Sequence, residues 1–151
     1  MSDLETTLRI SRLRAESYEL SKRYPEVTFD TKDGMWLHVK SLEIAKGWNR
    51  KRIEVLIDIP CGTPGYPSVA PQWFWADHDL KTDTGQPISH FFSRGLNEAD
   101  QQYTDKGWGH FCVHVNRWNP AGAGNLTKGH SLITYLDLIR AVFTDRKRLG
   151  N

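Results

Sequence analysis

The sequence predicts a single α+β domain over residues 1–151, with an N-terminal helix, a four-stranded antiparallel meander and a C-terminal helix behind the sheet. Three observations support this prediction. Apolar residues recur at helical spacing near both ends, and alternating apolar runs separated by turn residues lie between them. The chain has 151 residues, 38% hydrophobic and 25% charged, which is enough for one core of ordinary composition.

The first helix is expected from residue 3 to about residue 23. Asp3 can cap its N-terminus, and Pro25 stops it. The apolar stripe that would face the sheet consists of Ile10, Leu13, Ser17, Leu20 and Tyr24. Three basic residues, Arg9, Arg12 and Arg14, lie largely off this stripe and are therefore expected to be exposed.

Four strands are expected next, over residues 27–31, 35–45, 52–59 and 72–75. Asp33-Gly34 predicts the turn between the first two, because glycine tolerates a positive φ. The third strand has the clearest alternation and ends at Pro60, with Ile53, Val55, Ile57 and Ile59 on one face.

The rest of the chain contains a long polar segment and a second helix. Residues 77–108 have little periodicity, which predicts mostly irregular backbone anchored by Phe91 and Phe92. Ser131 can cap a last helix over residues 131–146, where apolar side chains again recur at helical spacing.

Residues 109–120, Gly-His-Phe-Cys-Val-His-Val-Asn-Arg-Trp-Asn-Pro, place Cys112 between His110 and His114. A strand over residues 111–115 would bring Cys112 and His114 to one face, with His110 beside them. Nearby imidazoles can raise the reactive thiolate fraction of a cysteine, so the stretch is compatible with a nucleophile. It is also compatible with a short strand in which Cys112 is a small core residue.

Composition argues against several other classes of protein. The formal net charge of +2, from 20 basic and 18 acidic side chains, is too balanced to predict a nucleic-acid binder. No signal peptide or membrane span is visible, so a cytoplasmic protein with reduced thiols and no membrane association is expected. Cys61 and Cys112 lack the paired spacing of a zinc site, and no metal or cofactor is expected. Cys61 is interpreted as a packing residue.

Three strings, in this order of elements, resemble the ubiquitin-conjugating enzyme family over roughly residues 10–145. Ile-Glu-Val-Leu-Ile-Asp-Ile-Pro at 53–60 is similar to the family's third strand, and Tyr66-Pro67 to its tyrosine-proline turn before the fourth strand. Gly109, Cys112 and Trp118-Asn119-Pro120 are similar to the glycine, catalytic cysteine and tryptophan-x-proline that precede its long helix. The resemblance implies that Cys112 accepts a ubiquitin-like protein as a thioester from an activating enzyme.

Two departures from the family resemble its divergent bacterial members. The histidine-proline-asparagine signature before the cysteine is absent, and so are the two C-terminal helices of eukaryotic members. Such bacterial proteins are encoded beside an activating enzyme, a ubiquitin-like protein and a JAB-type metalloprotease, often in antiviral defence operons. The resemblance therefore implies these three proteins as partners.

The resemblance also implies roles for further residues. Without the signature asparagine, the candidate donors to the reaction's oxyanion are His110, His114 and Asn116, with His90 and Asn97 upstream. The family's first helix contributes to docking the activating enzyme, which implies that Arg9, Arg12 and Arg14 form part of that surface.

Two other functions are compatible with these residues. A non-catalytic binding module of the same fold, a variant or RWD-like domain, would explain the missing asparagine. A cysteine hydrolase with a dyad of Cys112 and a histidine lacks a visible third orienting group. The cysteine placed before Trp-x-Pro favours the carrier.

Overall fold

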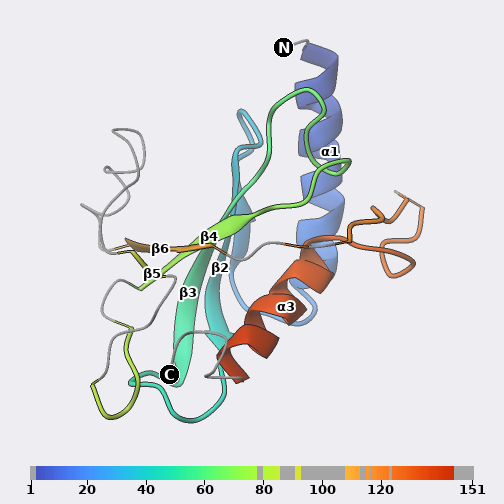
Figure 1. The fold of residues 1–151 in the computed structure, drawn as a ribbon. Coiled ribbons are helices and arrows are strands. Elements are labelled where there is room, and N and C mark those ends of the chain that lie inside the picture. The colour runs from blue at the N-terminus through green and yellow to red at the C-terminus, as the bar shows by residue number, and fades with distance from the viewer. Residues whose placement is uncertain are drawn as a thin grey trace.

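An antiparallel sheet lies at the centre of the protein, with two helices beside it (Figure 1). The computed structural model describes residues 3–77, 80–85, 91–92, 108–112, 115, 117–122 and 124–144. In spatial order, the strands within those ranges are β1 (Val27–Phe29), β2 (Trp36–Glu43), β3 (Arg52–Asp58), β4 (Trp73–Asp77), β6 (Trp108–Cys112) and β5 (Phe91–Phe92). All neighbouring strands are antiparallel.

The predicted meander corresponds to β1, β2, β3 and β4 and is confirmed. Gly34 in the first turn has a φ of 65°, as the Asp-Gly pair predicts. Ile53, Val55 and Ile57 of β3 are buried, which explains the alternation seen in the sequence.

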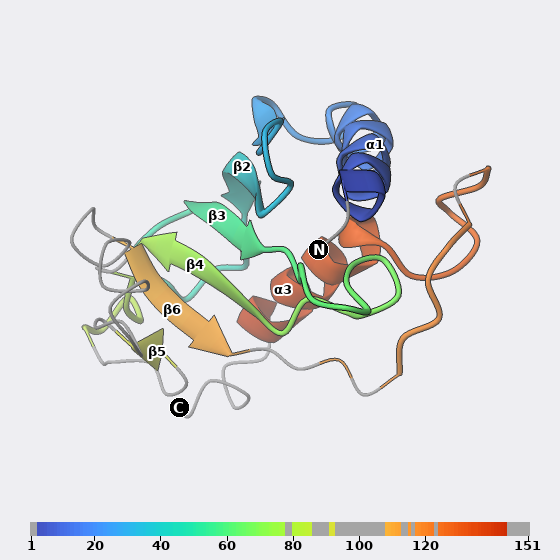
Figure 2. The ribbon, with the colours of Figure 1, turned by 90° about the horizontal axis from the view of Figure 1, so that it is seen from above.

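Both helices lie on the same side of the sheet (Figure 2). Helix α1 (Asp3–Leu20) buries Leu13 and Leu20, which pack in one hydrophobic core with the inner faces of the strands. Helix α3 (Leu132–Thr144) adds a larger apolar face to this core, made of Leu132, Tyr135, Leu136, Ile139, Val142 and Phe143. No helix in the described ranges is long and apolar enough to cross a bilayer.

The ends of α3 are held by side chains distant from one another in sequence. The Ser131 hydroxyl accepts a hydrogen bond from the Ile133 N–H at 3.1 Å, so the predicted cap is confirmed. At the other end, the Trp48 indole N–H donates to the Phe143 carbonyl at 2.8 Å. This bond satisfies one of the carbonyls that a helix leaves free at its C-terminus.

The sheet extends beyond the predicted meander by β6 and β5. β6 begins at Trp108 rather than at residue 111, because it pairs with β4 along its whole length, from Asp77↔Trp108 to Trp73↔Cys112. Phe91 and Phe92, expected to anchor an irregular segment, form β5 and pair with β6. Most of the remaining predicted irregular segment, residues 86–90 and 93–107, lies outside the described residues.

Candidate functional site

Cys112 is the last residue of β6 and pairs with Trp73, the first residue of β4. His110, two positions earlier, pairs with Trp75 on one side and Phe92 on the other. Alternation along a strand places positions 110 and 112 on the same face of β6, as predicted for this pair. His114, Asn116, His90 and Asn97 lie outside the described residues.

The loop of residues 60–72 leads directly into β4 and therefore to the register position opposite Cys112. It is tightly folded, since the Tyr66 N–H donates to the Pro60 carbonyl at 2.9 Å. A Cβ added at Gly65 would lie 2.8 Å from the Gly62 carbonyl oxygen, so glycine is required for this close approach. Tyr66-Pro67 joins through a cis peptide bond.

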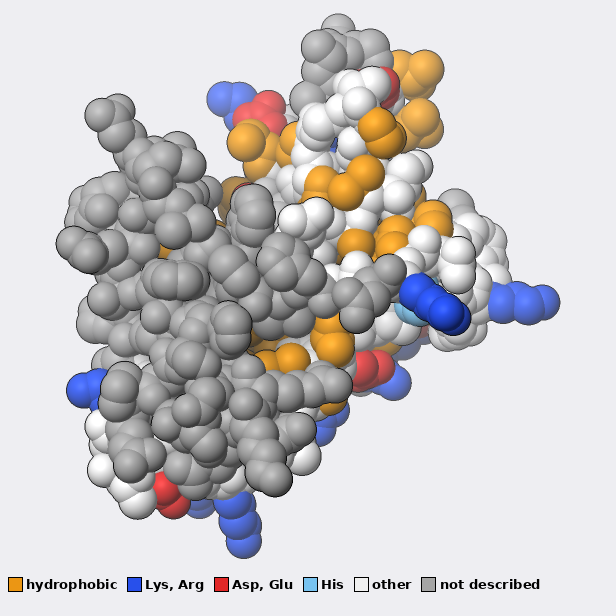
Figure 3. Space-filling model, viewed as in Figure 1, with side chains coloured by type: hydrophobic (Ala, Val, Ile, Leu, Met, Phe, Trp, Pro, Cys, Tyr) orange, Lys and Arg blue, Asp and Glu red, His pale blue; other side chains and the backbone are white. Residues whose placement is uncertain are grey.

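Hydrophobic side chains gather on the face of the molecule where this loop lies in front of α1 (Figure 3). Pro60, Pro67 and Val69 of the loop are half-buried there, whereas Tyr66 is buried. The loop therefore presents a partly apolar surface while its tyrosine points into the protein.

Trp118 connects the chain that follows β6 to the 60–72 loop. Its indole N–H donates to the Pro67 carbonyl at 2.7 Å, and its ring lies 6.2 Å from the Tyr66 ring. On its other side it stacks on His130, with ring centroids 5.4 Å apart and planes at 23°. The similarity to the family's tryptophan-x-proline thus corresponds to a packing role for Trp118.

His130, for which the sequence gives no motif, is part of this arrangement. Its Nδ1 accepts a hydrogen bond from the Asn119 N–H at 2.8 Å. The backbone N–H of His130 donates to the Asn119 carbonyl at 2.7 Å, and the backbone carbonyl of His130 accepts from the Ala121 N–H at 2.8 Å. His130 therefore closes the loop between the Trp-Asn-Pro string and α3.

Glu16 of α1 is fully buried and holds three segments together. Its carboxylate accepts hydrogen bonds from the Tyr66 hydroxyl at 2.6 Å and from the Leu132 N–H, at the N-terminus of α3, at 2.6 Å. The Arg12 guanidinium forms an ion pair with it. A carboxylate beside a helix N-terminus is stabilised by the unpaired N–H groups there.

Sequence reasoning missed Glu16, although a signal for it exists. It lies three positions after Leu13 and four before Leu20, both on the predicted apolar stripe. An acidic residue at that spacing falls on the buried face of the helix and requires partners.

The prediction that the three arginines are exposed is wrong for two of them. Arg9 and Arg12 are 4% and 8% exposed. Arg9 donates from Nε to the Gly34 carbonyl at 3.0 Å, and Arg12 donates from Nη1 to the Ala121 carbonyl at 2.5 Å. Long side chains of this kind can bury their stems and reach distant acceptors, which a helical wheel does not reveal. Arg14 is exposed, as predicted.

The other cysteine, Cys61, is half-buried in the same loop as Tyr66. Its thiol donates to the Ile59 carbonyl at 3.1 Å. Burial raises the pKa of the Cys61 thiol, which lowers its thiolate fraction at neutral pH. These features fit the interpretation of Cys61 as a packing residue.

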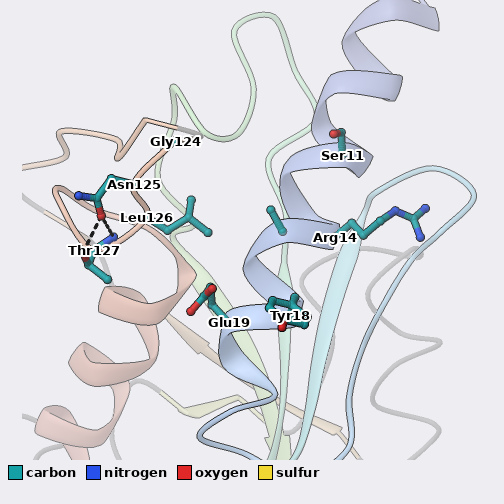
Figure 4. Close-up of a pocket in the computed structure, with 9 residues that line it drawn as sticks. Ser11, Arg14, Tyr18, Glu19, Gly124, Asn125, Leu126 and Thr127 are labelled. Carbon is teal, nitrogen blue, oxygen red and sulfur yellow. Dashed lines mark hydrogen bonds between the residues drawn. The ribbon is translucent and has the colours of Figure 1, made fainter.

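A groove of about 580 Å³ lies between α1 and residues 124–127 (Figure 4). It is lined by Ser11, Arg14, Ala15, Tyr18, Glu19, Gly124, Asn125, Leu126 and Thr127. None of these belongs to β6 or to the 60–72 loop, so the groove is not the site of Cys112. The described residues also include no group of three or more His, Cys, Asp or Glu side chains placed to hold a metal ion.

Comparison with known protein families gives a match over most of the chain. The model of Prokaryotic E2 family E matches residues 16–142, which include Glu16, Tyr66, Cys112 and Trp118. No curated protein and no solved structure gives a significant match.

Proposed function

The chain belongs to Prokaryotic E2 family E, a bacterial ubiquitin-conjugating enzyme-like family, and we propose that it carries a ubiquitin-like protein as a thioester on Cys112. The observation that supports this most is the family match across residues 16–142. Within that range, Cys112 is the last residue of β6 and pairs with Trp73 of β4. Family membership supports a role in ubiquitin-like conjugation. The assignment of Cys112 as nucleophile is our proposal.

The proposed reaction has two acyl transfers. The Cys112 thiolate attacks the thioester carbonyl of the modifier on the activating enzyme, and the thiolate of that enzyme leaves. An amine of the target then attacks the new thioester, an amide forms, the amine loses a proton, and the Cys112 thiolate is regenerated. No metal or cofactor takes part in either step.

Each transfer passes through a tetrahedral oxyanion that a hydrogen-bond donor would stabilise. We propose His110, His114 and Asn116 as candidates, with His90 and Asn97 further from Cys112 in sequence. His110 has the strongest support, because it shares a face of β6 with Cys112.

The proposed partners follow from this chemistry and from the family. They are a ubiquitin-like protein, its activating enzyme, and a JAB-type deubiquitinase encoded beside them, acting together in the cytoplasm in antiviral defence. We retain Arg14 as a docking residue for the activating enzyme, because it is exposed on α1. Arg9 and Arg12 are buried and are therefore not part of the proposed docking surface.

The experiment that tests the proposal compares the two cysteines of the chain. The protein is mixed with its activating enzyme, ATP and the ubiquitin-like protein, and adducts are separated with and without thiol reductant. Cys61→Ser should keep a reductant-sensitive adduct, whereas Cys112→Ser should give a reductant-resistant oxyester or none.

Two results would contradict the proposal in different ways. A reductant-sensitive adduct that survives Cys112→Ser and is lost in Cys61→Ser would move the site to Cys61. Absence of any adduct on the wild-type protein, with an activating enzyme shown to be active, would favour a non-catalytic binding module.

A further inference from the structure

One loop contacts the chain both at Cys112 and at Trp118, which follows it. Residues 60–72 run directly into Trp73, which pairs with Cys112 across β4 and β6. The Pro67 carbonyl of the same loop accepts the hydrogen bond of Trp118, which follows Cys112 in the chain. A shift of this loop would therefore move the backbone at Cys112 together with the chain at Trp118 that follows it.

The loop is fixed to the rest of the protein at Tyr66. Its hydroxyl donates to the fully buried Glu16 carboxylate, at 2.6 and 2.7 Å from the two oxygens. The same carboxylate is held by Leu132 N–H and by Arg12, so it is itself immobilised by α3 and α1. Buried and fully partnered, Glu16 is a rigid anchor for Tyr66.

We propose that Glu16 and Tyr66 are positioning residues for the thioester chemistry of Cys112, acting through the 60–72 loop. The proposal rests on the proposed function for its purpose, although its structural part can be tested without it. Reactive groups must be held within a fraction of an ångström for efficient transfer, and rigid surroundings provide this.

The direction of the Tyr66 hydrogen bond is fixed. Burial, followed by the negative charge of Glu16, raises the pKa of Tyr66, so the phenol stays protonated and donates. Phenylalanine at this position would remove that donor while keeping the ring beside Trp118.

The test uses a Cys61→Ser background, in which Cys112 is the remaining thiol. The rate of alkylation by iodoacetamide is measured against pH for Tyr66→Phe. Tyr24→Phe is the matched control, since Tyr24 is also a buried tyrosine of the core but lies outside the loop. We expect Tyr66→Phe to change the alkylation rate at fixed pH by about threefold or more and the control to leave it unchanged. If the alkylation rates of Tyr66→Phe and of the Cys61→Ser protein coincide at every pH, the proposal is overturned.

A second variant guards against a simple folding defect. Trp118→Phe removes the indole donor to Pro67 at a half-exposed position. If both contacts act through one loop, the double variant should show less than the product of the two single effects. Effects that multiply would show two independent contacts and would also overturn the proposal.

The transfer reaction supplies a second readout. In the protein that carries the thioester, Tyr66→Phe should slow discharge to a free amine on the order of tenfold, with KM for the activating enzyme within about twofold. Glu16→Gln, which keeps an acceptor for Tyr66, should slow discharge by less. A change in KM alone would contradict a positioning role. If the wild-type protein forms no thioester, the proposed function fails, and the alkylation profiles still decide whether Glu16 and Tyr66 position Cys112.

Discussion

Two buried arginines, one helical turn apart on α1, bind different kinds of partner. Arg9 donates to the backbone carbonyls of Asp33 and Gly34, in the turn between β1 and β2. Arg12 forms an ion pair with Glu16, which also receives Tyr66 and α3. The first region joins one helix to one turn, whereas the second joins α1, the 60–72 loop and α3.

The difference lies in what each region would lose if a partner were removed. Without Arg9, the turn keeps its own bonds, because the Asp30 carboxylate accepts from the N–H groups of Lys32, Asp33 and Met35. Without Glu16, the buried Arg12 guanidinium loses its counter-ion, and the donors of Tyr66 and Leu132 lose their acceptor. A buried ion pair adds little net stability, but removing one of its two partners is costly because the other charge stays buried and unpaired.

The largest effect should follow Glu16→Ala. We expect it to lower the free energy of unfolding by about 3–5 kcal/mol, the typical cost of leaving one member of a buried ion pair unpaired. Chemical denaturation followed by tryptophan fluorescence measures this. Glu16→Gln keeps an acceptor for Tyr66 and is expected to cost less, so equal losses would show that the acceptor is unimportant.

A smaller effect is expected for Arg9→Leu. Removing its donors to the two turn carbonyls should cost about 1–2 kcal/mol, while the leucine keeps part of the buried stem. The same denaturation measurement applies. A loss equal to that of Glu16→Ala would break the comparison, because it would show that hydrogen bonds to carbonyls matter as much as the ion pair.

Asp30 should give the Arg9 region a pH dependence. Burial acts to raise the pKa of Asp30, but the backbone donors of Asp33, Met35 and Lys32 and the charge of Lys32 outweigh it, so this pKa is below the ordinary value of 3.8. The stabilisation is then complete above pH 3.8 and is lost as pH falls through the lower folded-state pKa. Asp30→Asn should flatten this acid limb of stability, measured as the free energy of unfolding against pH. Parallel curves for variant and wild type would exclude Asp30 as the source.

The smallest change in stability is expected for Arg14→Glu. Arg14 is exposed and lies over the Phe29 ring at 5.6 Å, so reversal should change the unfolding free energy by no more than about 1 kcal/mol. It should nevertheless slow loading by the activating enzyme at low salt, since surface charge acts mainly on association rate. Lys22→Glu, at another exposed position near the end of α1, is the control. Unchanged loading by Arg14→Glu would remove Arg14 from the docking surface.

The sequence predicts the turn bound by Arg9 and the strands better than it predicts the contacts of Glu16. The Asp33-Gly34 turn and the β3 alternation are local signals, and both predict the observed structure. The partners of Glu16 lie 50 and 116 residues away in the chain, at Tyr66 and Leu132. Such pairings depend on packing that no local pattern encodes.

Pairing between distant segments also explains why β6 begins earlier than residue 111, where the sequence predicts it. Its limits are set by β4, its partner, rather than by its own apolar residues, and so the strand begins at Trp108. Cys112, Tyr66 and Trp118 were identified through the resemblance to a family. The roles of His130 and Glu16 required the structure, because each acts through contacts between distant segments.

The bonds between Asn119, Ala121 and His130 have a consequence for how the chain can vary. They close residues 122–129 into a loop whose ends are fixed, and a Cβ added at Gly124 would meet nothing within 4 Å. The entropy of closing such a loop grows slowly, by about 0.6 kcal/mol for each doubling of its length. Relatives should therefore tolerate insertions here, and a short glycine-serine peptide or an epitope tag placed at Gly124 should leave the sheet and α3 unchanged.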